Sequence, residues 1–330
     1  MKISSLAMVF LTGLICKTFF SMSFSCHLPR FKKSNGQPAQ QFLPSNKTRH
    51  PLAPPYPFPY KFLMNPQEKC QSRNPFLVLL VASQSHDVMS RLAVRETWGN
   101  ESNYGDVDVV TVFLVGLPTV ASDKVQQLLE KENNIYGDIM QQDFMDTYYN
   151  LTLKTLMGIE WVTKYCPTAS YVMKTDSDMF INVNYLIHKI LLTVSSGREN
   201  FFTGNIRNNT GPIRTNDSKW YVPKEVYPDD SYPVYCSGSG YIFSSILAQK
   251  IYDVAQVVNI LPMEDVFIGM CLEKLNVTIT APIKNIFYGV WKNYDRCLFN
   301  KLVTVHDYAR EKLKEVWTDF WSKKDSGCPD

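Results

Sequence analysis

The sequence predicts an α/β fold, because strand-like and helix-like segments alternate along its middle part. Residues 76–82 and 107–115 are nearly continuous apolar runs rich in β-branched side chains, of the kind that parallel sheets bury. A polar stretch of helical character, residues 87–98, lies between them. This order of strand, helix and strand is typical of a parallel sheet covered by helices.

The same alternation continues toward the carboxyl terminus. Residues 150–165 carry apolar side chains at helical spacing, and an apolar run that begins at Tyr171 predicts a buried strand. Residues 181–192 resume an apolar pattern that suits a helix packed against the sheet. Residues 264–275 predict a further helix, and an amphipathic stripe at 313–320 predicts a last one.

Length and composition limit the function classes. The chain has 330 residues, of which 45% are hydrophobic and 13% aromatic, enough for one well-packed domain with appendages. Its formal net charge is only +3, and no concentrated basic stripe appears. We therefore expect no nucleic-acid partner.

The amino-terminal residues predict a membrane anchor. Residues 3–24 are apolar except for scattered Ser and Thr and one Lys17, and as a helix they would reach about 33 Å. No clear small-x-small cleavage site follows, so an uncleaved signal anchor at 1–24 is favoured over a signal peptide. Residues 25–72 are rich in Pro, Lys, Ser and Asn and predict a stem, which leaves 73–330 as the globular domain.

Sequons and cysteines indicate an oxidising lumen. Six asparagines begin an Asn-x-Ser/Thr sequon: Asn46, Asn100, Asn150, Asn208, Asn216 and Asn276. Six of the eight cysteines lie at residue 70 or beyond, and no Cys-x2-Cys pair exists, which favours disulfides over zinc. Their pairing stays open, because six cysteines allow about 15 connectivities.

Two carboxylates follow the strand that begins at Tyr171. In an extended segment the side chains of Asp176 and Asp178 point the same way, beyond the carboxyl end of the strand, where open α/β sheets bind ligands. Hard oxygen ligands suit Mg²⁺ or Mn²⁺, which in turn hold diphosphates. The alternative is a solvated turn. No Walker or Gly-x-Gly-x-x-Gly loop is present, so phosphate binding would depend on metal and basic side chains.

Several segments, taken together and in order, resemble the beta-1,3-galactosyltransferase family of the Golgi. The resemblance covers roughly residues 70–310, and its motifs are Arg91-Leu-Ala-Val-Arg-Glu-Thr-Trp-Gly99, Phe113-Leu-Val-Gly116, Asp143-Phe-Met-Asp-Thr-Tyr-Tyr-Asn-Leu-Thr-Leu-Lys154, Lys174-Thr-Asp-Ser-Asp178, Cys236-Ser-Gly-Ser-Gly240 and Glu264-Asp-Val-Phe-Ile-Gly269. It implies a GT-A glycosyltransferase fold, which is Rossmann-like, with UDP-galactose as donor, Mn²⁺ as cofactor and inversion at the anomeric carbon.

The resemblance also assigns roles at the reacting centre. Asp178, helped by Asp176, would hold the cation. Alternatively, Asp176 would contact the ribose or a metal-bound water. His306 would complete the metal shell, or it is structural. For the base we favour Asp265, with Glu264 as its rival; the alternative is that both acids merely complement a helix amino terminus.

Basic residues of the matching segments are candidates for UDP-sugar binding. Arg91 and Arg95 are one helical turn apart and could share a face toward the nucleotide, unless that face is simply solvated. Lys154 is a similar case. Lys174 is instead predicted to steady the acidic pair.

Aromatic residues and glycines are candidates for the donor and acceptor pocket. Trp220 and Tyr221 offer faces for stacking on a sugar, and Gly238 and Gly240 permit close approach of the donor. Core packing explains the aromatic residues equally well.

These observations predict a single-pass type II Golgi membrane enzyme with a lumenal catalytic domain. It would move galactose from UDP-galactose to the 3-hydroxyl of a terminal N-acetylglucosamine or N-acetylgalactosamine on glycoproteins or glycolipids. A sister N-acetylglucosaminyltransferase and a catalytically silent lumenal lectin or chaperone are the rivals. Whether the protein forms a homodimer stays open.

Overall fold

The computed structural model describes residues 53–194, 198–282, 284–322 and 327–328. The predicted anchor at 1–24 and the stem as far as residue 52 lie outside these ranges. Within them, no helix combines the length and the apolar character needed to cross a bilayer.

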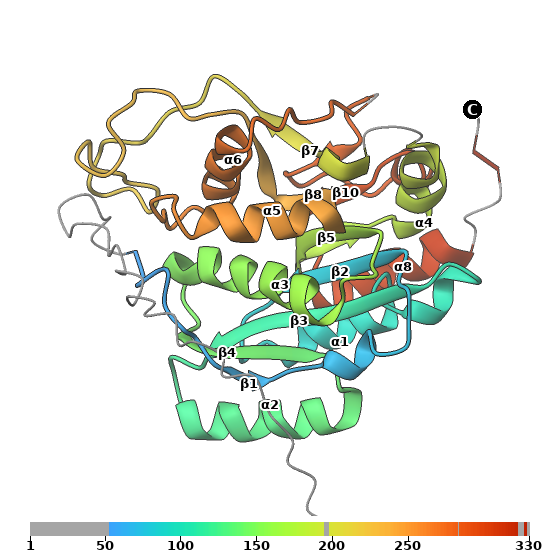
Figure 1. The fold of residues 1–330 in the computed structure, drawn as a ribbon. Coiled ribbons are helices and arrows are strands. Elements are labelled where there is room, and N and C mark those ends of the chain that lie inside the picture. Colours follow the sequence, from blue (N-terminus) through green and yellow to red (C-terminus); the bar gives the residue numbers. More distant parts are fainter. Residues whose placement is uncertain (1–52, 195–197, 283, 323–326, 329–330) are drawn as a thin grey trace, which may run out of the picture. The chain divides into compact units, whose positions relative to one another are not determined.

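A mixed sheet organises the described residues (Figure 1). Its seven strands run in the order β1-β4-β3-β2-β5-β8-β7. They are β1 (Phe62–Met64), β2 (Leu77–Ala82), β3 (Val109–Leu117), β4 (Ile139–Met145), β5 (Tyr171–Asp176), β7 (Phe202–Arg207) and β8 (Tyr235–Ser244). Strands β4, β3, β2 and β5 are parallel, whereas β1, β8 and β7 each pair antiparallel with their neighbours. The predicted α/β class is therefore confirmed.

Helices cover both faces of this sheet, and β2 shows why its sequence is apolar throughout. Its side chains alternate between faces, so Val78 and Leu80 join one core while Leu77, Leu79 and Val81 join the other. The first core lies under α3 (Leu151–Tyr165), α5 (Ser245–Ala255) and α6 (Glu264–Lys274), and the second under α1 (Val88–Glu96) and α8 (Arg310–Ser322). A strand buried on both faces has no solvent side for polar residues.

The remaining helical elements are α2 and a set of short turns. Helix α2 contributes Leu129 to a small core with β3 and β4. Their bounds are α2 (Ser122–Tyr136), α4 (Val183–Tyr185), α7 (Arg296–Phe299), the π-helix η4 (Leu186–Ile190), and the 3-10 turns η1 (Gln67–Lys69), η2 (Glu101–Tyr104), η3 (Tyr148–Asn150), η5 (Leu191–Thr193) and η6 (Arg198–Asn200). Helices were predicted over 87–98, 150–165, 264–275 and 313–320, and α1, α3, α6 and α8 confirm them.

A second, three-stranded sheet positions the acidic turn. Its strands are β6 (Met179–Ile181), β10 (Thr304–His306) and β9 (Phe287–Tyr288), in the order β6-β10-β9. The prediction of a helix over 181–192 differs from this structure, because β6 takes Ile181 into the sheet and the helical turns begin at Val183. Strand β6 depends on β10, more than a hundred residues later in the chain, which a local pattern does not reveal.

Two disulfides confirm the predicted use of cysteine. Cys70 pairs with Cys166, the residue that follows α3, and Cys297 pairs with Cys328. The other two cysteines of the globular part, Cys236 and Cys271, are buried as free thiols.

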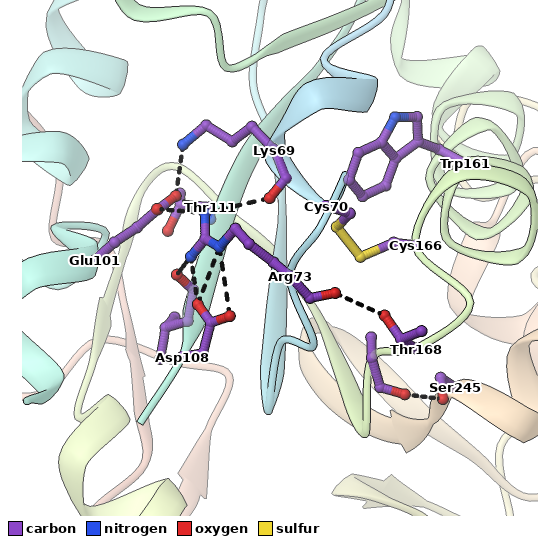
Figure 2. Close-up of a disulfide and its surroundings, with 12 residues drawn as sticks. Lys69, Cys70, Arg73, Glu101, Asp108, Thr111, Trp161, Cys166, Thr168 and Ser245 are labelled. Atoms are coloured by element: carbon purple, nitrogen blue, oxygen red, sulfur yellow. Dashed lines mark hydrogen bonds and ion pairs between the residues drawn. A yellow bond between two sulfur atoms is a disulfide. The ribbon is translucent and has the colours of Figure 1, made fainter. Parts of the chain in front are cut away.

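An ion cluster lies beside the Cys70–Cys166 bond (Figure 2). Lys69 contacts Glu101 at 2.5 Å, and Arg73 pairs with both Glu101 and Asp108. Arg73 precedes β2 and Asp108 precedes β3, so this cluster fixes the amino ends of the parallel strands. Asp176 lies at the opposite, carboxyl end of the sheet.

Candidate active site

Two adjoining cavities open at the carboxyl ends of β2, β4 and β5. The first lobe, about 650 Å³, is lined by residues 83–87, Lys154, Asp178, Asp307, Ala309 and Arg310, among others. The second lobe, about 560 Å³, is lined by Lys174, Arg207, Trp220, residues 237–239 and Asp265, among others. Tyr148, Leu151 and Asp176 line both lobes, so the two cavities meet at the end of β5.

The acidic pair lies where the sequence predicts it. Asp176 is the last residue of β5, and Asp178 occupies the turn before β6. Pairing of β6 with β10 sets Met179 opposite His306, which brings the His306 Nε2 within 3.4 Å of the Asp178 Oδ2. The structure therefore places all three predicted metal ligands at the junction of the lobes.

The other oxygen of Asp178 has no visible partner. Asp178 Oδ1 is buried and accepts no hydrogen bond from the described residues. Burial alone would raise the pKa of this carboxyl, but the hydrogen bond and charge of His306 outweigh it, so the pKa is lowered and the group is ionised. Asp178 in turn raises the pKa of His306. A buried anionic oxygen without a donor is costly, and a cation would satisfy it.

Lys174 connects the acidic pair to α6. Its Nζ donates to Asp176 Oδ1 at 2.9 Å, to Gly238 O at 2.8 Å and to Glu264 Oε1 at 2.8 Å. Burial would lower the pKa of Lys174, but the charges of Asp176 and Glu264 raise it, so the ammonium stays protonated. Lys174 therefore steadies the acidic pair.

The structure separates the two candidate bases. Glu264 is buried, and besides Lys174 it accepts a hydrogen bond from Tyr241 Oη at 2.9 Å, so both its oxygens are engaged. Asp265 lines the second lobe and is only partly buried, with its oxygens accepting from the backbone N–H of Gly238 at 3.2 Å and of Val266 at 2.9 Å. Burial raises the pKa of Asp265, as suits a general base.

The two predicted glycines leave room for neighbouring side chains. A Cβ on Gly238 would lie 2.4 Å from Glu264 Oε1, so this glycine admits the buried carboxylate. A Cβ on Gly240 would meet Thr304 Cγ2 at 3.0 Å, and Gly240 lines neither lobe. Both glycines therefore make room for protein atoms, Gly238 also lines the second lobe, and the approach of a donor to them stays a prediction.

The structure places Arg91 and Arg95 away from the cleft lining. Arg91 is fully buried and donates to both oxygens of Glu132, at 2.8 and 2.6 Å. Arg95 donates to Glu132 at 2.7 Å and to Asp138 at 2.8 Å. Arg91 also donates to Gln84 O at 2.6 Å, so it supports the loop that lines the first lobe. Their direct binding of nucleotide, which the sequence suggested, does not match this burial.

Lys154 supports the same loop from the other side. Its buried Nζ donates to Ser83 O and to Asp146 Oδ1, both at 2.6 Å. Asp146 Oδ2 accepts from the backbone N–H of Ser85 at 2.9 Å. The sequence analysis did not predict Asp146 as a site residue. Its position directly after β4 is the signal that could have found it, because ligands bind at the carboxyl ends of parallel strands.

An aromatic pair stands at the rim of the second lobe. Trp220 is 46% exposed and donates from Nε1 to Tyr148 Oη at 2.8 Å. The Lys219 ammonium lies 4.5 Å from the Trp220 ring centroid and 5.1 Å from that of Tyr148. Tyr221 pairs with Ile213 and is absent from the lining of both lobes. Trp220 therefore fits the predicted pocket, Tyr221 does not, and Tyr148 was missed.

The sequons differ in exposure. Three of the asparagines are exposed: Asn208, Asn216 and Asn276. Asn100 and Asn150 are partly buried; Asn100 accepts from Ser102, and Asn150 Nδ2 donates to Met145 O at 2.7 Å. Asn46 lies outside the described residues.

Comparison with known proteins identifies the family. The galactosyltransferase family model matches residues 89–282. Beta-1,3-galactosyltransferase 2 of Mus musculus is 42% identical over 275 residues, which cover 83% of this chain but only 65% of that relative, so the chain spans somewhat less than two thirds of its length. Beta-1,3-galactosyltransferase 1 of the same species is 43% identical over 273 residues, covering 82% of both chains.

A solved galactosyltransferase, LgtC in complex with donor and acceptor sugar analogues, aligns over 73% of this chain and 95% of its own, with 10% identity and a TM-score of 0.41. That likeness is too low to add to the evidence from the relatives. By the family match and the two relatives, the chain belongs to the galactosyltransferase family, among the beta-1,3-galactosyltransferases.

Proposed function

We propose that this protein is an inverting beta-1,3-galactosyltransferase of the GT-A type. It takes galactose from UDP-galactose and adds it to the 3-hydroxyl of a terminal N-acetylglucosamine or N-acetylgalactosamine. One observation carries this proposal: Asp178 and Asp265 line different lobes, and the two lobes meet at Asp176. One lobe can then hold the donor diphosphate while the other holds the acceptor. The names of the relatives support the sugar and the linkage.

Asp178 and His306 would hold the divalent cation, with Mn²⁺ as the proposed ion and Asp176 beside them on a metal-bound water or the ribose. The buried Asp178 oxygen without a donor and the imidazole beside it fit such an ion. The described residues contain no group of three or more His, Cys, Asp and Glu side chains close enough to enclose a metal. Few protein ligands suit Mg²⁺-like ions, which take their other ligands from phosphate and water. When bound, the ion would neutralise charge on the departing diphosphate.

Asp265 would act on the acceptor. Its carboxylate takes the proton from the acceptor 3-hydroxyl as that oxygen bonds to the anomeric carbon of galactose. The bond from that carbon to the UDP oxygen breaks on the opposite face, so the configuration inverts. The backbone N–H groups of Gly238 and Val266 fix the orientation of the carboxylate. Trp220 at the rim offers a face for the acceptor sugar.

A lumenal location fits the covalent features of the chain. Two disulfides and exposed sequons suit an oxidising compartment with glycosylation machinery. We propose a Golgi enzyme of type II topology, with 1–24 as anchor and a stem that ends before β1, because that strand and Cys70 belong to the sheet domain that we propose to be lumenal and catalytic.

A matrix of UDP-sugars against acceptors, assayed with and without Mn²⁺, tests this proposal. Product should form from UDP-galactose with acceptors that end in N-acetylglucosamine or N-acetylgalactosamine, and chelation of the metal should abolish it. Transfer from UDP-N-acetylglucosamine instead would replace the donor assignment. Absence of transfer from every UDP-sugar, with glycan binding intact, would favour a lectin.

A further inference from the structure

Within the described residues, four lysine and arginine side chains line the two lobes: Lys154 and Arg310 in the first, Lys174 and Arg207 in the second. Two of these side chains already donate hydrogen bonds to protein acceptors. Lys154 is buried against Ser83 O and Asp146, and Lys174 already donates to three oxygens. A buried ammonium with such partners has little capacity left for a ligand.

Arg207 and Arg310 are the more exposed pair, and they line different lobes. Arg207 ends β7 in the second lobe, the one that contains Asp265. Arg310 lines the first lobe together with Asp178, and its side chain is 57% exposed. Of the two, Arg310 is therefore the one beside the proposed diphosphate position.

The segment that carries Arg310 is attached to the metal-binding turn. It follows His306 directly, and the backbone N–H of Tyr308 donates to Asp178 O at 2.8 Å. Asp307 and Arg310 have φ of 70° and 52°, a left-handed conformation that residues with a side chain rarely adopt. Such conformations persist where the surroundings hold them, and they cluster at ligand sites.

Among the described residues, one carboxylate pairs with the guanidinium of Arg310. Arg310 Nη2 lies 3.1 Å from Asp87 Oδ1. Asp87 is itself fixed as the amino-terminal cap of α1, where it accepts from the backbone N–H of Ser90 at 3.2 Å. A guanidinium has five N–H donors, so this contact leaves several of them for a ligand.

We propose that Arg310 binds the diphosphate of the nucleotide sugar in the first lobe, an assignment that rests on the proposed function. A guanidinium matches two phosphate oxygens at once and keeps its charge. Asp87 orients the guanidinium of Arg310. The chain has no glycine-rich loop that would bind the phosphates in its place. Arg310 then stabilises the negative charge on UDP as the sugar departs.

Calorimetric titration of the full-length protein with UDP and with UMP, in the presence of Mn²⁺, tests this assignment. Arg310→Gln should weaken UDP binding by about 10-fold to 100-fold, the range expected for lost charge-assisted hydrogen bonds. Because UMP lacks the second phosphate, its affinity should change much less. Arg310→Lys keeps a charge but loses the fork, so its UDP affinity should lie between those of the wild type and Arg310→Gln; this variant decides the matter if Arg310→Gln fails to fold.

Lys314→Gln provides a matched control. Lys314 of α8 contacts Glu96 of α1 at 2.9 Å, so it joins the same two helices without lining either lobe. Its loss should leave UDP affinity unchanged. Asp87→Asn keeps a good helix cap but removes the ion pair, and it should weaken UDP binding far less than Arg310→Gln.

Three results would overturn the assignment: an Arg310→Gln protein that binds UDP like the wild type, equal losses for UDP and UMP, or a loss in Asp87→Asn as large as that in Arg310→Gln. A wild-type protein that fails to bind UDP would instead refute the proposed function itself.

Discussion

Substitution of the two neighbouring acids of α6 should give opposite outcomes. Glu264 is buried and holds Lys174 at 2.8 Å, whereas Asp265 lines the second lobe. Removal of one partner from a buried ion pair costs about 3–5 kcal/mol. In Glu264→Gln, Lys174 keeps Asp176 and Gly238 O, so we expect the lower end, about 3 kcal/mol. For a domain of this size, that is a fall in Tm of about 6–12 °C.

Asp265→Asn should have little effect on stability. Its amide oxygen can replace one of the two acceptor contacts to the backbone, so the loss is about 1 kcal/mol. Loss of the general base should lower kcat by about 10²-fold to 10⁴-fold. Glu264→Gln, assayed below its Tm, should keep kcat within about tenfold of the wild type, since it removes no such base.

The measurements are thermal unfolding and initial rates of UDP release at saturating donor and acceptor. Activity should be lost in the Asp265 variant and stability in the Glu264 variant. A Glu264→Gln protein that is inactive at an unchanged Tm, beside an active Asp265→Asn protein, would refute this division of roles.

Three further predictions concern the base, the covalent frame and the acceptor rim. Burial raises the pKa of Asp265, and a general base must be ionised to act. We therefore expect kcat to fall as the pH drops through a value above the ordinary aspartate pKa of about 4. A kcat that stays constant down to pH of about 4 would contradict this. Replacement of Cys70 and Cys166 by serine should lower the free energy of unfolding in urea by about 2–4 kcal/mol, because the bond joins residues 96 positions apart; an unchanged midpoint would argue against it. Trp220→Ala should raise the acceptor KM about tenfold by removing apolar contact area, while Trp220→Phe keeps most of the effect of the ring; equal KM values in all three proteins would exclude stacking there.

Much of the fold was predictable because it depends on local patterns. The continuous apolar runs at β2 and β3 reflect burial on both faces, and the helical spacing at α3 reflects one buried stripe. The acidic pair was predictable for a similar reason, since a strand that ends in Asp176 sets Asp178 two residues further on. Secondary structure and burial that follow from the pattern of one segment can be inferred from that segment.

The arginines show where such inference ends. Arg91 and Arg95 share a helix face as predicted, but their partner Glu132 lies 41 and 37 residues later, on α2. Whether a basic face meets a nucleotide or a carboxylate depends on that distant helix. Arg310 is the converse case, because its position beside the cleft depends on the pairing of β10 with β6 and carries no sequence motif.

The central claim is that Asp178 and His306 hold a divalent cation against the diphosphate of UDP. Anomalous diffraction from crystals grown with UDP and Mn²⁺ measures this directly. We expect a manganese peak between Asp178 Oδ1 and His306 Nε2, in contact with a phosphate oxygen. Bound UDP with no manganese at that position, or with Asp178 turned away from the phosphates, would contradict the claim.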